Sequence, residues 1–168
     1  MNIYKFVVMI CVVVGLTGCG AGNSKFQTYN GPKITHVVIS KTDRKMWLIH
    51  EDKVVDSFPI DLGFAPAGHK QFEGDGKTPE GSYFIDRRNP NSSFHLSLGI
   101  SYPNDKDIAF AQEQGKKPGG DIFIHGQPNG KRRVGDPDWT AGCISVKNKH
   151  IRKIYAMVQD GTQVTINP

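Results

Sequence analysis

Two residues of the sequence, His125 and Cys143, have the types and the spacing needed for nucleophilic catalysis. A short apolar segment, residues 122–124, leads to His125, and a polar loop rich in glycine and proline leads to Gly142 and Cys143. A thiol attacks a carbonyl carbon well only as a thiolate, and a histidine within hydrogen-bond reach can take its proton to give a thiolate–imidazolium pair. We therefore expect Cys143 to be a nucleophile and His125 its general base and acid.

The elements that must position this pair are mostly strands. Alternating or β-branched apolar segments bounded by turn residues are typical of strands. Such segments lie at residues 34–40, 46–50, 54–62, 82–86, 95–100, 122–124 and 162–166. The first three follow each other within thirty residues without helical periodicity, which predicts an antiparallel start, and Pro59 places the third at an edge or a bulge.

Two short helices complete the predicted domain. Residues 104–114 have helical character and are followed by Gly115. In residues 148–159 apolar side chains recur with helical period, which predicts an amphipathic helix. They are Ile151, Ile154, Tyr155 and Val158. Residues 63–81 are too rich in glycine and proline for an element interior, so they predict a long surface loop.

The N-terminus has the features of an export signal. Lys5 precedes an apolar run at residues 6–14, which is too short to span a bilayer comfortably, and small residues follow up to Cys19. The sequence Leu-Thr-Gly-Cys resembles the lipobox of bacterial lipoproteins, which implies cleavage before Cys19 and lipid on its thiol; an uncleaved N-terminal helix is the alternative. The predicted divisions are a lipoprotein signal peptide (1–18), the lipidated cysteine and a flexible tether (19–32), and a catalytic domain (33–168).

The number of cysteines supports a chemical role for one of them. Of the three, Cys11 would leave with the signal and Cys19 would carry lipid, so Cys143 would be alone in the exported domain. A single thiol in an oxidising compartment is either buried and inert or retained for its chemistry. The histidine partner favours the second reading.

The stretch around the pair resembles a known enzyme family. His-Gly after a strand, followed 18 residues after the histidine by Cys143 within Thr-x-Gly-Cys, is similar to the YkuD-type L,D-transpeptidases, which use a cysteine to cross-link bacterial peptidoglycan. The resemblance covers about residues 33–166, and the segments 68–81 and 89–103 are similar to the murein L,D-transpeptidase YafK-like branch. It implies a mainly β, YkuD-like β-sandwich with two short helices. Two positions depart from many members: Ala141 replaces a histidine and Ser145 replaces an arginine.

The reaction is implied by this resemblance. Cys143 would attack the carbonyl between meso-diaminopimelate and D-Ala in a tetrapeptide stem and transfer the acyl group to an amine, giving a 3-3 cross-link or an anchored protein. Backbone N–H groups of Ala141, Gly142 and Cys143 are candidates for the oxyanion hole, because glycine permits close approach of the chain. A backbone carbonyl, from Gly126 or Thr140, would orient the imidazole of His125.

Substrate contacts are predicted from residues near the pair. Arg132 and Arg133 lie on the loop between the histidine and the cysteine, and guanidinium groups bind carboxylates bidentately, although a charge run is also typical of a solvated face. His95 begins a predicted strand and has either a substrate contact or a structural role. Gly126 and Thr140 are further candidates.

Composition restricts the partners. The chain has 21 Lys and Arg against 16 Asp and Glu, a net charge of +5, which suits a polyanionic cell wall or membrane face. No nucleic-acid-binding motif is recognisable, and no spacing resembles a zinc motif, so we expect neither nucleic acid, metal nor cofactor.

Several outcomes share the predicted acyl-enzyme. An amine of another stem gives a cross-link, a lysine of a wall-linked lipoprotein gives anchoring, and water gives hydrolysis, as in a YafK-like amidase that cleaves the peptidoglycan–lipoprotein bond. A function of another class, a non-catalytic peptidoglycan-binding lipoprotein, is favoured by Ala141 and Ser145 and opposed by the intact His125, Gly142 and Cys143. The expected location is exported and lipid-anchored, facing the periplasm or cell wall, at the inner leaflet of the outer membrane in a Gram-negative cell.

Overall fold

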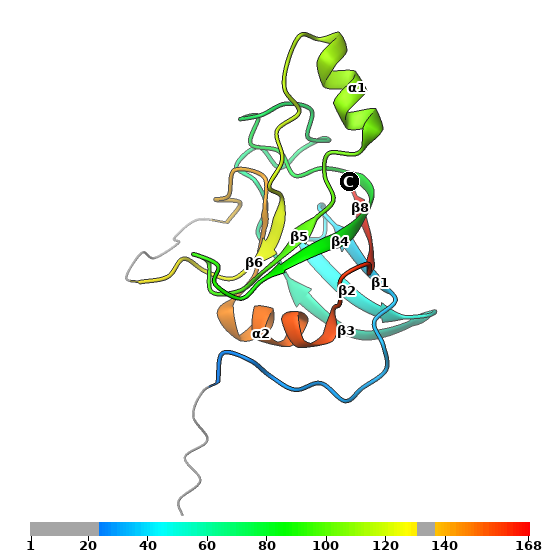
Figure 1. Ribbon diagram of the computed structural model, residues 1–168, viewed down its shortest axis with the longest axis vertical. Coiled ribbons are helices and arrows are strands. Elements are labelled where there is room, and N and C mark those ends of the chain that lie inside the picture. Colours follow the sequence, from blue (N-terminus) through cyan, green and yellow to red (C-terminus); the bar gives the residue numbers. More distant parts are fainter. Residues whose placement is uncertain (1–23, 131–136) are drawn as a thin grey trace, which may run out of the picture.

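The computed structural model describes residues 24–130 and 137–168, which form eight strands and two helices (Figure 1). Their order is β1 (His36–Ser40), β2 (Lys45–His50), β3 (Lys53–Pro59), β4 (Gly81–Asn89), β5 (Ser97–Ile100), α1 (Asp105–Glu113), β6 (Phe123–His125), β7 (Ile144–Ser145), α2 (Asn148–Met157) and β8 (Gln163–Asn167).

The strands form one continuous sheet in the order β3-β2-β1-β8-β4-β5-β6-β7. The first three strands are antiparallel to one another, which confirms the predicted start, and β3 is an edge strand that ends at Pro59, where the missing N–H disturbs no central ladder. Only β1–β8 and β6–β7 pair in parallel among the described strands.

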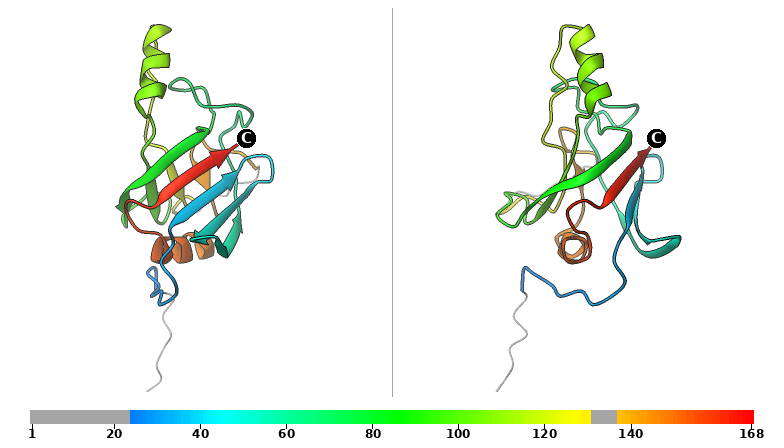
Figure 2. Two further views of the ribbon diagram at one scale, coloured as in Figure 1. Left: turned by 90° about the vertical axis from the view of Figure 1, so that its right-hand side faces the viewer. Right: turned by 45° about the vertical axis from the view of Figure 1, so that its right-hand side comes forward.

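Strand β4 joins the two halves of the sheet. Its first residues, Gly81 to Phe84, pair with β8, and its later residues pair with β5 after a register shift between Ile85 and Arg87. A bulge of this kind bends a strand and increases its twist. The sheet therefore curls back on itself (Figure 2). The predicted mainly β sandwich with two helices is confirmed, and both of its layers are parts of one continuous sheet.

Helix α2 closes one side of the curled sheet (Figures 1 and 2). The residues predicted for its apolar face, Ile151, Ile154, Tyr155 and Val158, are all buried. Burying each aliphatic side chain contributes about 1.5–3 kcal/mol, so this stripe accounts for the position of the helix.

Helix α1 projects from the other end of the molecule (Figures 1 and 2). It begins with a capping box, in which the Asn104 side chain accepts from the N–H of Asp107 and the Asp107 carboxylate accepts from the N–H of Asn104. Satisfying two of the free donors at a helix start stabilises it locally.

Three predicted strands are longer than the observed ones, and the first of them, predicted from residue 34, begins at His36 as β1. His95 was expected to begin a strand, but its φ of +70° is incompatible with extended backbone, and β5 starts at Ser97. Residues 60–62 were expected to continue β3, but the chain leaves that edge after Pro59, and Asp61 forms a bridge with Ser145.

The described residues before β1 lie against the domain. Lys25 Nζ donates to the carbonyl of Pro90 at 2.6 Å, and the rings of Phe26 and Tyr155 lie 6.3 Å apart. Figure 1 shows this segment passing beneath α2. The predicted signal peptide and Cys19 lie outside the described residues. Within the described part of the chain, no helix has the length and apolar character required to cross a membrane.

Candidate active site

Strands β6 and β7 bring His125 and Cys143 to one place. These strands are parallel neighbours, with Ile124 opposite Ile144, and Cys143 directly precedes β7. Both side chains line a cavity of about 300 Å³ whose wall also includes Asp121. The register of two short strands thus places a thiol and an imidazole, separated by a long loop, at a common surface.

The imidazole of His125 is oriented by its own neighbour in the chain. His125 is buried, and its Nδ1 lies 2.7 Å from the carbonyl oxygen of Gly126. Because a carbonyl can only accept, Nδ1 carries the proton and Nε2 carries the lone pair. Of the two carbonyls considered from the sequence, Gly126 occupies this position, and its own N–H donates to the carbonyl of Phe94 at 3.0 Å.

Burial favours the neutral forms of both groups. It lowers the pKa of His125, against the opposing effect of the hydrogen bond to Gly126. It raises the pKa of Cys143, against the opposing effect of the Phe123 N–H, which faces the sulfur. The thiol donates to the carbonyl of Asp121 at 3.4 Å. Burial therefore disfavours the charged forms of both groups, and with them a thiolate–imidazolium pair in the free site.

The turn before Cys143 is held by Thr140. Its Oγ1 donates to the carbonyl of Cys143 at 2.6 Å and accepts from the N–H of Gly142 at 3.1 Å. Gly142 has a φ of +131°, and a Cβ there would lie 2.6 Å from the carbonyl oxygen of Lys77, so only glycine fits. The N–H of Gly142 is engaged, whereas those of Ala141 and Cys143 have no acceptor among the described residues.

Ser145 occupies the position at which many members of the resembled family have arginine. It is fully buried, its backbone pairs with Asp61, and its Oγ lies 3.1 Å from Nε2 of Gln127, which donates to it. Ala141 is exposed on the turn. The serine thus makes a local structural contact with a glutamine.

None of the described candidates for a substrate contact lines this cavity; they are His95, Gly126 and Thr140. The backbone N–H of His95 donates to Oδ1 of Asn129. Burial lowers the pKa of the His95 imidazole, and the charges of Lys25 and Arg152 act in the same direction. Arg132 and Arg133 lie outside the described residues.

Two aromatic residues at the imidazole were missed from the sequence. The ring of Phe94 lies 4.6 Å from that of His125, and the ring of Trp139 lies 5.7 Å from it in an edge-to-face arrangement. The contacts of Phe94 and Trp139 with His125 join three separate segments of the chain. The periodicity within one segment therefore could not predict them.

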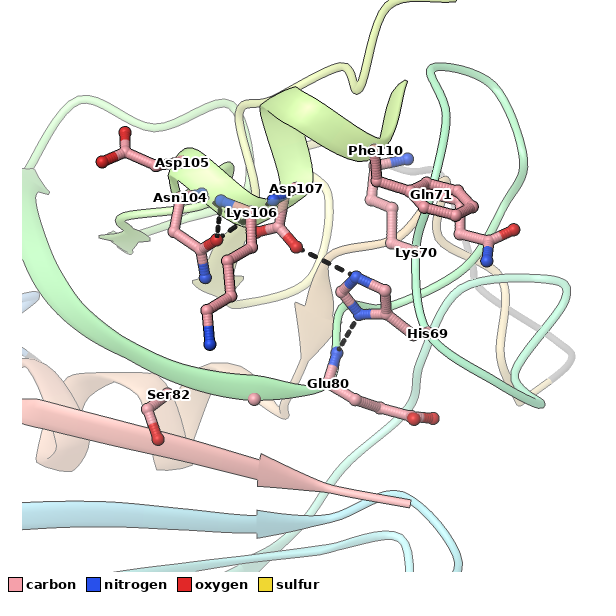
Figure 3. Close-up of a pocket in the computed structure, with 11 residues that line it drawn as sticks. His69, Lys70, Gln71, Glu80, Ser82, Asn104, Asp105, Lys106, Asp107 and Phe110 are labelled. Carbon is pink, nitrogen blue, oxygen red and sulfur yellow. Dashed lines mark hydrogen bonds and ion pairs between the residues drawn. The ribbon is translucent and has the colours of Figure 1, made fainter. Parts of the chain in front are cut away.

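A larger cavity of about 900 Å³ lies between α1 and the start of β4 (Figure 3). Its histidine, His69, accepts from the N–H of Glu80 at Nδ1 (2.9 Å) and donates from Nε2 to Asp107 at 3.0 Å. The second oxygen of Asp107 accepts from the hydroxyl of Tyr83 at 3.1 Å. Both ring nitrogens are engaged, so this imidazole has no lone pair free to accept a proton from a substrate.

Metal ligands are not clustered in the described ranges 24–130 and 137–168. No group of three or more His, Cys, Asp or Glu side chains there is arranged to hold a metal ion. Asp138 forms an ion pair with Arg44 at 2.6 Å and accepts from the N–H of Leu62. Asp138 therefore has a structural role.

The family relationship follows from comparison with known proteins. Residues 34–166 match the model of the YkuD family, the L,D-transpeptidase catalytic domain. The chain belongs to this family. It is 30% identical over 125 residues to the Escherichia coli K12 protein YafK, which is named provisionally as an L,D-transpeptidase; the match covers 69% of this chain and 45% of YafK.

Solved structures agree with the fold. The helical cell shape determining protein Pgp2 of Campylobacter jejuni (K307A mutant) has 30% identity and a TM-score of 0.64, over 86% of this chain and 51% of that one. Bd1075 of Bdellovibrio bacteriovorus has 25% identity and a TM-score of 0.56, over 84% and 51%. L,D-transpeptidase 1 of Mycobacterium tuberculosis, at 13% identity and a TM-score of 0.51 over 79% and 60%, shares the fold. The chain spans about half the length of the first relatives.

Proposed function

We propose that this protein is a peptidoglycan L,D-transpeptidase in which Cys143 is the nucleophile and His125 the general base and acid. One observation carries the proposal: the thiol lines the same cavity as a buried imidazole whose Nδ1 is fixed to Gly126, which leaves Nε2 unprotonated. A neutral imidazole is the form that can accept the thiol proton. YkuD family membership supports the reaction class.

The proposed acylation step uses these groups in order. Sγ of Cys143 attacks the carbonyl carbon of the bond between meso-diaminopimelate and D-Ala while its proton passes to Nε2 of His125. When the tetrahedral intermediate collapses, the carbon–nitrogen bond breaks and the D-Ala amine takes that proton. D-Ala leaves, and a thioester to Cys143 remains.

The oxyanion is stabilised by backbone donors of the turn. Because Thr140 already accepts from the N–H of Gly142, the proposed donors are the N–H groups of Ala141 and Cys143. Removing one such donor from an oxyanion hole typically costs about 2.7–4 kcal/mol in the transition state. Of the three backbone N–H groups predicted for the oxyanion hole, this proposal thus keeps two.

Transfer completes the reaction. An amine of a second stem, or of a protein to be anchored, attacks the thioester, His125 takes the amine proton, and the thiol of Cys143 re-forms. Water in place of the amine would give hydrolysis. The substrate class, a peptidoglycan stem peptide, is taken from the family name and is supported by the similarity to a cell-shape protein, Pgp2.

We also propose export and a lipid anchor on Cys19. The apolar run before this residue and the Leu-Thr-Gly-Cys sequence support it. The expected result of Cys19→Ala is loss of the protein from the membrane fraction, and incorporation of labelled palmitate only into the unaltered chain. Membrane association equal in both chains would contradict the anchor.

The central experiment uses the purified full chain and Cys143→Ala with tetrapeptide muropeptides, followed by mass spectrometry. A cross-linked dimer with loss of D-Ala, absent with the variant, supports the transpeptidase. Loss of D-Ala to water alone supports a hydrolase, which is then tested on lipoprotein-linked muropeptides. No Cys143-dependent product from any of these substrates contradicts the proposed enzyme and favours a binding protein.

A further inference from the structure

The imidazole of His125 is enclosed by aromatic rings from two other segments. Phe94, in the loop before β5, lies 4.6 Å from it between ring centroids, and Trp139, in the segment before β7, lies 5.7 Å away. The two rings also contact each other at 5.9 Å. Together they form an aromatic clamp, a name we use for Phe94 and Trp139.

The clamp acts on a ring that has one hydrogen bond to the described residues, 24–130 and 137–168. The bond from Nδ1 to Gly126 fixes one edge of the imidazole, but a single bond still permits rotation about it. Aromatic rings in contact at tilted and edge-to-face angles, here 39° and 73°, favour particular orientations by about 0.5–1.5 kcal/mol per pair. The clamp therefore restricts the ring plane that the hydrogen bond leaves free.

The same rings exclude water from the imidazole. His125 is 4% exposed, and its pKa is lowered by burial, without a contribution from a charged neighbour. The titratable groups around it are Cys143 and Asp121, which line its cavity, and Asp61 and Asp138, beside Trp139. Asp121 pairs with Arg87 and Asp138 with Arg44.

We propose that Phe94 and Trp139 are positioning residues that hold the ring of His125 in a fixed orientation at the cavity that it shares with Cys143. This inference rests on the proposed function, because it assigns the clamp to the base of that reaction. Trp139 is the better test of it, since Phe94 also lines the cavity and Trp139 does not.

The test substitutes each ring and follows His125 directly. Trp139→Leu and Phe94→Leu remove one aromatic wall each, and Trp139→Phe keeps a ring as the conservative variant. Phe110→Leu is the matched control, because Phe110 stacks on Phe72 at 5.9 Å and lines the other cavity. The His125 ring signal, assigned by its absence in His125→Gln, is titrated by NMR in each full chain, and thermal unfolding establishes that each variant is folded.

Water admitted to the ring stabilises the imidazolium, so the titration midpoint of His125 rises toward the ordinary value of about 6.5 in both leucine variants. The lower midpoint of the pH profile of kcat/KM rises by the same number of pH units. At a pH below this midpoint, kcat/KM of the variant is therefore about tenfold lower than that of the unaltered chain for each unit of the rise. In Trp139→Leu kcat falls and KM is unchanged. Trp139→Phe and Phe110→Leu behave as the unaltered chain.

The result that overturns the clamp is a His125 midpoint in both leucine variants that coincides with that of the unaltered chain. The NMR titration needs no substrate. A chain without activity on any muropeptide, but with the expected midpoint shifts, would contradict the proposed function and support the clamp around His125.

Discussion

His125 and His69 each line a cavity, and the larger cavity belongs to His69. His69 uses both ring nitrogens, one with the N–H of Glu80 and one with Asp107, and it ties α1 to the long loop. His125 uses one nitrogen, with its neighbour Gly126, and within the described part of the chain the other has no partner and belongs to a cavity that Cys143 also lines. An imidazole with both nitrogens bonded has no lone pair left for a proton, whereas the ring of His125 keeps the one that the proposed general base requires.

The largest expected difference between the two histidines is in activity. His125→Gln removes the proposed base and should reduce kcat/KM by about 10²–10⁴-fold, the usual contribution of a general base. The measurement is release of D-Ala from muropeptides. His69→Gln is the matched control, and an equal loss in both variants would remove the functional distinction between the two cavities.

The turn that presents the thiol should show a smaller effect. Thr140→Val removes the hydroxyl that joins the carbonyl of Cys143 to the N–H of Gly142, two bonds of about 0.5–1.5 kcal/mol each. We expect kcat/KM to fall about tenfold. Thr162→Val is the control, because Thr162 is also buried and lines neither cavity. Unchanged activity of Thr140→Val would show that the turn keeps its shape without the hydroxyl.

The structural histidine should matter for stability. His69→Ala leaves the buried carboxylate of Asp107 without one of its donors, and we expect the free energy of unfolding to fall by about 1–3 kcal/mol with kcat/KM unchanged. Urea unfolding measures it. His50→Ala removes a histidine whose Nδ1 bonds only the carbonyl of Lys33, near the surface, and should cost less. A larger loss in His50→Ala would contradict the structural role given to His69.

The smallest effect concerns the resting protonation state. Burial raises the pKa of Cys143, so little thiolate is present at neutral pH, and iodoacetamide alkylation should accelerate with pH through the ordinary thiol range without reaching a plateau there. Because burial disfavours the charged forms of both groups, His125→Gln should move this profile by less than about half a pH unit. A fast, pH-independent rate at neutral pH that is lost in His125→Gln would instead establish a resting ion pair.

Local patterns in the sequence predicted most elements correctly. The stripe of Ile151, Ile154, Tyr155 and Val158 predicted α2 because one period relates these residues, and all four are buried. His95 was assigned to a strand since alternation cannot reveal a φ of +70°. The start of β5 was thus predicted wrongly because the backbone conformation of His95 decides it.

The candidate site was predictable only in part, for the same reason. His125 and Cys143 carry chemistry in their residue types, so they could be selected from the sequence. For the carbonyl that orients the imidazole, the sequence left two candidates, Gly126 and Thr140, and the structure has Gly126 there. The hydrogen bond from the N–H of Gly142 to Thr140 could not be predicted from the sequence. The contacts of Phe94 and Trp139 with His125 depend on the register of β5, β6 and β7, which is a property of the whole sheet.

The position of β8 has a consequence for how the domain is assembled. β8 separates β1 from β4, so His36, which pairs with Ile49 on one side, has its partner on the other side only at Gln163. Pairings between distant segments form slowly, because closing a long loop costs entropy before any contact compensates for it. The sheet ladder between β1–β3 and β4–β7 is therefore complete only when residues 163–167 take their place between β1 and β4. During synthesis, a nascent chain that does not yet include this strand therefore holds Cys143 in an unfinished domain.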